Sequence, residues 1–135
     1  MATVNVTLSL SSTNLFEKQS ISFTETDVLA PAGDQQLIGR LKTSGSGTKD
    51  NIALKALDGT NDLAYLFLHN LSATTGEYVK VSLCATHGSD SAGGDWFAVL
   101  GPGEFLFIPT SDMQDVDVEA AAGNPVVEYV LMEKA

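Results

Sequence analysis

Nine or ten short runs with the residue pattern of β-strands, and no segment with helical periodicity, restrict this chain to an all-β fold. Residues 3–10 (TVNVTLSL) alternate strictly between apolar and small polar residues, which is typical of a strand with one buried face. Glycine, proline and aspartate fill the intervals between the runs, as expected for turns. The remaining runs lie at 20–26, 37–43, 51–57, 63–71, 78–86, 96–100, 104–109, 116–120 and 126–133.

The regular spacing of these runs predicts a single antiparallel β-sandwich domain of the jelly-roll kind over residues 1–135. The alternation near the start predicts that residues 1–20 contain an arm or edge strand that can pair with a neighbour. The short run at 116–120 (VDVEA) also alternates, so one of its faces is expected to be exposed to water.

Several runs are apolar at both odd and even positions, although a strand of a two-layer sandwich should bury only one face. These runs need a second cover, which could be a partner subunit or a loop of the same chain such as the predicted loop at 29–36 (LAPAGDQQ). Two of the runs are predicted to form a hairpin through Gly101-Pro102-Gly103. The doubly apolar runs are 63–71, 96–100, 104–109 and 126–132.

The chain carries 17 acidic and 7 basic residues, for a net charge of −10. Binding to nucleic-acid phosphates needs Lys and Arg, so this balance argues against a nucleic-acid partner. Residues 1–85 carry eight acids and six bases, whereas residues 86–135 carry nine acids and one base, Lys134. The first part is therefore predicted to approach acidic partner surfaces more easily, through residues such as Arg40 and Lys42. No apolar run reaches ~18 residues and the start lacks a basic, apolar leader, so neither a membrane span nor a secretory signal is expected.

One group of residues offers metal ligands but lacks the spacing of known sites. His87, Asp90 and Asp95 lie together in HGSDSAGGD, and His69 lies one strand earlier. Facial-triad and cupin sites use further histidines at defined spacings, and these are missing here. We therefore interpret the segment as a turn and assign no metal ligand.

Two other combinations could act on sugars. Glu104 with Asp112 or Asp115 could form a glycosidase-type carboxylate pair. Trp96 and Tyr78 could stack on a carbohydrate, although core or interface roles account for both. Neither pattern specifies a reaction, so no catalytic or cofactor-binding residue is assigned, and the chain is predicted not to be an enzyme.

Three stretches in the second half of the chain, over roughly residues 63–134, share one order of strands and turns: LAYLFLHNLSATTGEYVKVSL, DWFAVLGPGEFLFIP and VDVEAAAGNPVVEYVLMEK. In these stretches the chain resembles the small β-sandwich virion proteins of tailed bacteriophages. Such domains occur as capsid decoration (cement) proteins and as tail or fibre components. The resemblance implies a structural, oligomeric and non-enzymatic part of a virus particle.

The predicted function is that of a capsid decoration protein, made in the host cytoplasm and located on the capsid exterior. Its expected partners are further copies of itself, as a homo-oligomer such as a trimer, and the major capsid protein; no cofactor, nucleic acid or membrane is expected. The alternatives are a tail or fibre subunit, a carbohydrate-binding module and a small cupin-like enzyme. The candidate interface residues, of which the four aromatic ones are expected to line the core and an interface, are Val4, Val6, Leu8, Arg40, Lys42, Trp96, Phe97, Phe105 and Phe107.

Overall fold

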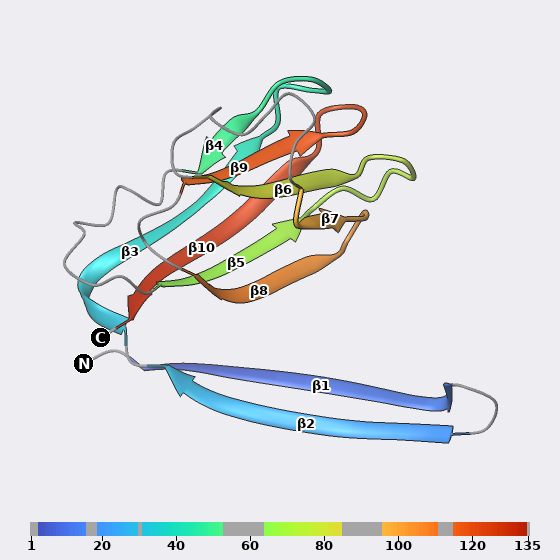
Figure 1. Cartoon of the computed structure of the whole chain (residues 1–135), viewed down its shortest axis with the longest axis vertical. Helices are drawn as coiled ribbons and strands as arrows, with labels where there is room; N and C mark the ends of the chain where they lie inside the picture. Colours follow the sequence, from blue (N-terminus) through green and yellow to red (C-terminus); the bar gives the residue numbers. More distant parts are fainter. Residues whose placement is uncertain are drawn as a thin grey trace.

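The computed structural model describes residues 3–15, 19–29, 31–52, 64–84, 96–110 and 115–134. These residues form ten strands in antiparallel sheets and no helix, so the prediction of an all-β fold is confirmed for them (Figure 1). Consequently no described segment forms a helix that could cross a membrane.

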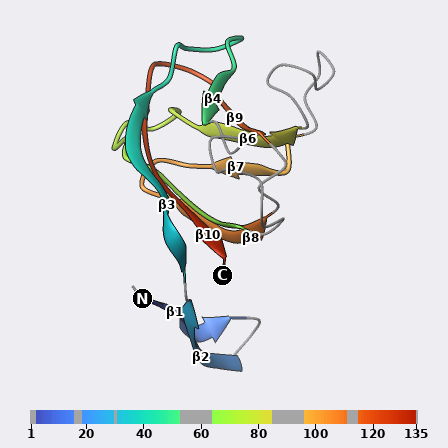
Figure 2. The same ribbon diagram turned by 90° about the vertical axis from the view of Figure 1, so that its left-hand side faces the viewer.

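The strands belong to three sheets. The N-terminal hairpin consists of β1 (Val4–Leu15) and β2 (Gln19–Leu29), which pair only with each other among the described residues. Sheet I has the order β3-β10-β5-β8, and sheet II has the order β4-β9-β6-β7 (Figures 1 and 2). Their strands are β3 (Pro31–Lys42), β4 (Asp50–Ile52), β5 (Ala64–Asn70), β6 (Val79–Cys84), β7 (Ala98–Leu100), β8 (Phe105–Thr110), β9 (Asp115–Ala120) and β10 (Val126–Lys134).

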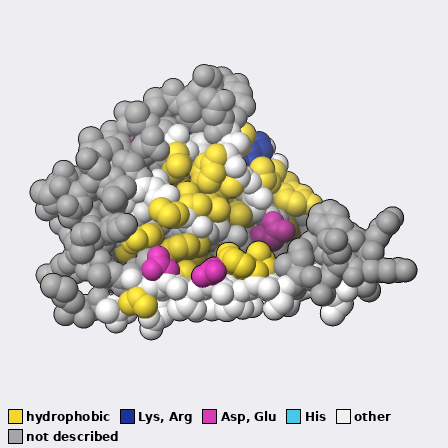
Figure 3. All heavy atoms as spheres, turned by 60° about the horizontal axis from the view of Figure 1, so that its bottom comes forward, with side chains coloured by type: hydrophobic (Ala, Val, Ile, Leu, Met, Phe, Trp, Pro, Cys, Tyr) yellow, Lys and Arg dark blue, Asp and Glu magenta, His cyan; other side chains and the backbone are white. Residues whose placement is uncertain are grey.

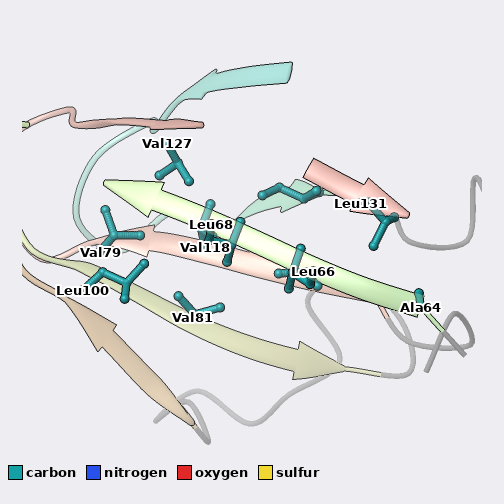
Figure 4. Close-up of a cluster of buried hydrophobic side chains, with 11 residues drawn as sticks. Ala64, Leu66, Leu68, Val79, Val81, Leu100, Val118, Val127 and Leu131 are labelled. Carbon is teal, nitrogen blue, oxygen red and sulfur yellow. The ribbon is translucent and has the colours of Figure 1, made fainter. Parts of the chain in front are cut away.

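Sheets I and II share one hydrophobic core, in the arrangement of a β-sandwich (Figure 4). Alternate residues of each strand point into it, because successive side chains of a strand point to opposite faces. Leu66 and Leu68 enter from sheet I and are fully buried, and Val81 meets them from sheet II. Full burial of a side chain of this size stabilises the fold by about 1.5–3 kcal/mol.

The segment 29–36 was predicted to be a loop, and this prediction is wrong. Strand β3 begins at Pro31 and pairs with the last residues of β10, with Gln36 opposite Met132 and Pro31 opposite Lys134. The register shifts once within this stretch. Because β3 lies at the edge of sheet I, a proline at its first residue removes no ladder hydrogen bond that the sheet needs. This segment is therefore not a loop folded over the sheet.

The runs 96–100 and 104–109 were predicted to form a hairpin, and this is also wrong. Strand β7 pairs with β6 in sheet II, whereas β8 pairs with β5 in sheet I. The turn between them is therefore a corner from one sheet to the other. Buried Asn70 holds this corner, because its Nδ2 donates to the carbonyl oxygens of Leu100 (3.2 Å) and Gly101 (3.1 Å).

Strand β9 was expected to have one face in water, but all six of its residues are buried. Its acidic side chains have polar partners instead of solvent. Asn51 Nδ2 donates to Asp117 Oδ1 at 3.0 Å, and Lys80 Nζ lies 3.1 Å from Glu119 Oε1. Burial of a carboxylate is tolerated only where such partners replace water. The alternation of apolar and acidic residues in β9 was identified correctly, but the inference that its acidic face is exposed to water was wrong.

Candidate assembly surface

The outer face of sheet I, which points away from the core, is apolar except for a row formed by Arg40, Glu128 and His69. On β5 and β8, apolar residues occupy most outward-facing positions as well as the core-facing ones. The outward-facing residues include four aromatic ones: Tyr65, Phe67, Phe105 and Phe107. Phe67 and Phe105 lie with ring centroids 6.1 Å apart, and Tyr65 and Phe107 are stacked at 6.0 Å. Strands β10 and β3 extend this face with Val130, Met132 and Ile38.

The base of the N-terminal hairpin covers one end of this face. Val4 and Val6 pack against Tyr65 and Met132, whose side chains are only 8% and 5% exposed. Part of the outer apolar face of β5 and β10 is therefore covered by the hairpin of the same chain. The remainder of the face is open, since Phe105 is 61% exposed.

A groove of about 420 Å³ lies between the hairpin and sheet I. Its size is within the range of about 300–1,000 Å³ that is usual for binding clefts. Figure 3 shows hydrophobic side chains gathered on this side of the molecule, with acidic side chains beside them. The groove is lined by Val4, Asn5, Val6, Thr7, Ile38, Phe67, Phe105, Phe107, Val130 and Met132.

The hairpin itself is amphipathic. On one face, Thr7 pairs with Thr26 and Ser9 with Thr24 through hydroxyl hydrogen bonds of 3.3 Å. The opposite face carries an apolar stripe, defined here as Val4, Val6, Leu8 and Leu10 of β1 with Phe23 of β2, which lies opposite Leu10. Beyond Val6 the stripe leaves the sandwich, and its last three side chains are between 41% and 53% exposed.

Charged groups lie close to both apolar surfaces. On sheet I, Arg40 donates to Glu128 Oε1 through Nη2 (2.9 Å) and Nε (3.0 Å), while its side chain remains 67% exposed. Lys42, at the end of the same strand, is also exposed. On the stripe side of the hairpin, Glu25 lies opposite Leu8 and Asp27 opposite Val6, and both acids are exposed.

The structure brings some of the candidate interface residues together and separates others. Val4, Val6, Phe105 and Phe107 line one groove, with Leu8 next along the stripe. Arg40 and Lys42 lie on β3 at the edge of the same sheet.

Trp96 and Phe97 lie elsewhere, directly before β7 of sheet II. The Nζ atoms of Lys49 and Lys80 lie 5.3 and 5.4 Å from the centroid of the Trp96 ring, and Phe97 is exposed. The expectation that the four aromatic candidates line the core is wrong for Phe97 and Phe105, which are exposed, whereas Phe107 is half-buried and packs against the buried cluster of Tyr65 and Met132.

Sequence reasoning missed several residues of this surface. Tyr65, Phe67 and Val130 lie in runs that were recognised as apolar on both faces. The pattern therefore indicated an outward apolar face, but these three residues were not named as part of it. Leu10 and Phe23 could also have been found, because they continue the alternation of the first two strands.

The residues considered for chemistry have other roles or cannot be placed. Glu104 Oε2 accepts a hydrogen bond from the backbone N–H of Gly101 at 2.7 Å, which fixes the corner between the sheets. His69 Nδ1 lies 3.9 Å from Glu128 Oε2 on the outer face of sheet I. His87, Asp90, Asp95 and Asp112 lie outside the described residues. Among the residues that are described, no group of three or more His, Cys, Asp or Glu side chains is placed to hold a metal ion.

Comparison with known proteins gives no relative for this chain: no protein family, curated protein or solved structure matches it.

Proposed function

We propose that this protein is a structural component of a tailed-bacteriophage particle, namely a capsid decoration protein that self-associates and binds the outer capsid surface. The observation that carries the proposal is the apolar surface formed by the outer face of sheet I and the hairpin stripe. Monomeric proteins rarely leave large contiguous apolar patches in water, and such patches usually mark protein interfaces. Aromatic residues such as Phe67 and Phe105 are also enriched at interfaces.

We further propose that β3 to β10 form a jelly roll. Support comes from nested strand pairs, in which the first strand pairs with the last and each inner strand with its counterpart: β3 with β10, β4 with β9, β5 with β8, and β6 with β7. Two more pairings, β5 with β10 and β6 with β9, join these pairs into the two sheets. Jelly rolls are found in viral capsid proteins, and also in lectins and cupins, so this topology alone does not select a function.

An extended apolar surface suits a protein partner better than a sugar. Sugar binding would use an accessible aromatic ring; of the two candidates, Trp96 is half-buried with two lysine ammonium groups next to it, whereas Tyr78 is 44% exposed. A tail or fibre subunit would use the same kind of apolar surface as a decoration protein. These two roles differ in where the protein sits on the particle, which imaging can determine.

The test is to mix the purified protein with undecorated capsids, assembled from the major capsid protein of the same phage, and with tailed particles that lack this protein. Electron cryo-microscopy should then show added density on the outer shell at regular positions. Density on the tail alone would replace decoration with the tail or fibre role. An absence of added density on either structure would contradict the proposal.

A further inference from the structure

We propose that the outer part of the hairpin stripe of one copy docks on the open outer face of sheet I of a second copy. The docking residues would be Leu8, Leu10 and Phe23 on one copy, and Ile38, Phe67 and Phe105 on the other. This inference rests on the proposed self-association and identifies the two surfaces that carry it.

The inner part of the stripe already makes this kind of contact within one chain. Val4 and Val6 pack on Tyr65 and Met132, and they bury both side chains. Leu8 and Leu10 follow at the same two-residue spacing and on the same face of the hairpin. An interface between copies would therefore continue an existing contact with residues of the same chemistry.

The outer part of the stripe is not covered by its own sheet, since Leu8 is 46% and Leu10 is 53% exposed. Figure 1 shows the hairpin extending beyond the edge of the two sheets. A two-stranded hairpin is marginally stable by itself in water, so cover for its exposed apolar side would stabilise it.

The receiving surface is suitable in shape and in charge. The groove of about 420 Å³ has one wall from the base of the hairpin and a floor that includes Phe67 and Phe105. Glu25 and Asp27 accompany the stripe, and Arg40 and Lys42 lie on the edge strand of the receiving sheet. The exposed Arg40 guanidinium has donors beyond those used by Glu128, so it can also bind a carboxylate of a second copy.

A contact of one surface with a different surface is heterologous, and it forms a ring when the rotation between copies closes. Each copy in such a ring would donate one stripe and receive one. A closed ring also presents several equal contacts to a capsid, which multiplies weak attachments.

The test uses two variants that each lose one of the two surfaces. The stripe variant carries Leu8→Glu and Leu10→Glu, and the face variant carries Phe105→Glu. Val28→Glu is the control for the hairpin, since Val28 is 61% exposed on its opposite face. Val99→Glu is the control for the sandwich, since Val99 is 57% exposed on β7 of sheet II.

Mass is measured by size-exclusion chromatography with light scattering at micromolar concentration. The unaltered chain and both controls should form the same oligomer, and each docking variant alone should have the monomer mass of 14.2 kDa. An equal mixture of the two docking variants should form a one-to-one complex. The reason is that the face variant keeps an intact stripe and the stripe variant keeps an intact face.

Three results with the variants would overturn the inference: an oligomer formed by either docking variant alone, a mixture that stays monomeric, or an equal loss of association in the controls. Circular dichroism and thermal unfolding show whether each variant is folded, and Leu8→Ser with Leu10→Ser, or Phe105→Ser, replaces any variant that is not. An unaltered chain that is monomeric would also overturn it. The capsid-binding proposal would still be decided separately by imaging, so the two failures can be told apart.

Discussion

The rings of Tyr65 on β5 and Phe107 on β8 are stacked, with centroids 6.0 Å apart and planes inclined by 9°, on the side of sheet I that faces away from the core. Val4 and Val6 of the hairpin close over this end of the sheet. Sheet I therefore has apolar packing on both faces, from sheet II on one side and from the hairpin on the other. An aromatic pair of this kind contributes about 0.5–1.5 kcal/mol beyond the burial of its area.

The two faces of sheet I should differ strongly in their response to truncation. We expect Leu66→Ala to lower the free energy of unfolding by about 2–5 kcal/mol, because it leaves a cavity in the core. Phe105→Ala should cost less than about 1 kcal/mol in the monomer, because its side chain is mostly in water. Urea unfolding measures both, in the background of the stripe variant so that self-association does not contribute. Equal losses would mean that Phe105 is buried by its own chain.

Asn70 should be among the most sensitive polar residues. Its Nδ2 atom lies within hydrogen-bonding distance of the carbonyl oxygens of Glu77, Leu100 and Gly101, and its Oδ1 accepts from the N–H of Ser72. We expect Asn70→Ala to cost about 2–4 kcal/mol in urea unfolding, because buried groups lose their partners.

The matched control for this change is Asn124→Ala. Asn124 is exposed and donates from Nδ2 to the Thr43 carbonyl oxygen at 2.9 Å. Its loss should cost no more than about 1 kcal/mol, because it removes one hydrogen bond from an exposed side chain rather than several from a buried one. A cost for Asn70→Ala as small as that of the control would show that the corner between the sheets does not depend on Asn70.

The Lys80–Glu119 ion pair should contribute more to stability than the Arg40–Glu128 ion pair. Glu119 is almost fully buried beside Lys80, so Lys80→Met would leave a buried carboxylate without this partner and should cost about 2–4 kcal/mol. Arg40 is largely exposed beside Glu128, so Arg40→Met should cost less than about 1 kcal/mol. Thermal unfolding of both variants in the stripe-variant background measures the difference. A larger effect at Arg40 would contradict this ranking.

Self-association should respond to charge reversal in a salt-dependent way. We expect Arg40→Glu to weaken association, because it would place the new glutamate, and Glu128 without its partner, close to Glu25 and Asp27 of the docked hairpin. The effect should become smaller between about 0.05 and 0.5 M salt, since screening shortens the range of exposed charges. Association of the unaltered chain should persist at high salt because its main contacts are apolar. Sedimentation velocity at both salt concentrations measures these differences, and an equal effect of Arg40→Glu at both would exclude the charged contact.

The positions of most strands could be predicted because their signals are local. Residues 63–71 and 126–133 are dense in apolar and β-branched residues, and the strands β5 and β10 lie within one residue of these limits. Two features depended on pairing between distant segments. Pro31 and Gln36 join a strand only because the end of β10 is available to pair with them. Similarly, nothing near Gly101 indicates that β7 and β8 pair with different sheets.

The sequence could predict that an apolar surface exists, but not where on the fold it lies. The doubly apolar runs indicated that a second cover was needed, and the base of the hairpin supplies part of it through Val4 and Val6. The position of that contact depends on the direction in which the hairpin leaves the sandwich, which no local pattern contains. The exposure of β9 was mispredicted for a related reason, because Asp117 and Glu119 have partners on other strands.

Sedimentation equilibrium of the unaltered chain, from about 1 to 100 µM, tests the central claim most directly. Self-association through the hairpin and sheet I predicts a mass above 14.2 kDa that rises with concentration toward a single closed oligomer. A mass of 14.2 kDa across the whole range would contradict the claim that this apolar surface joins copies of the chain.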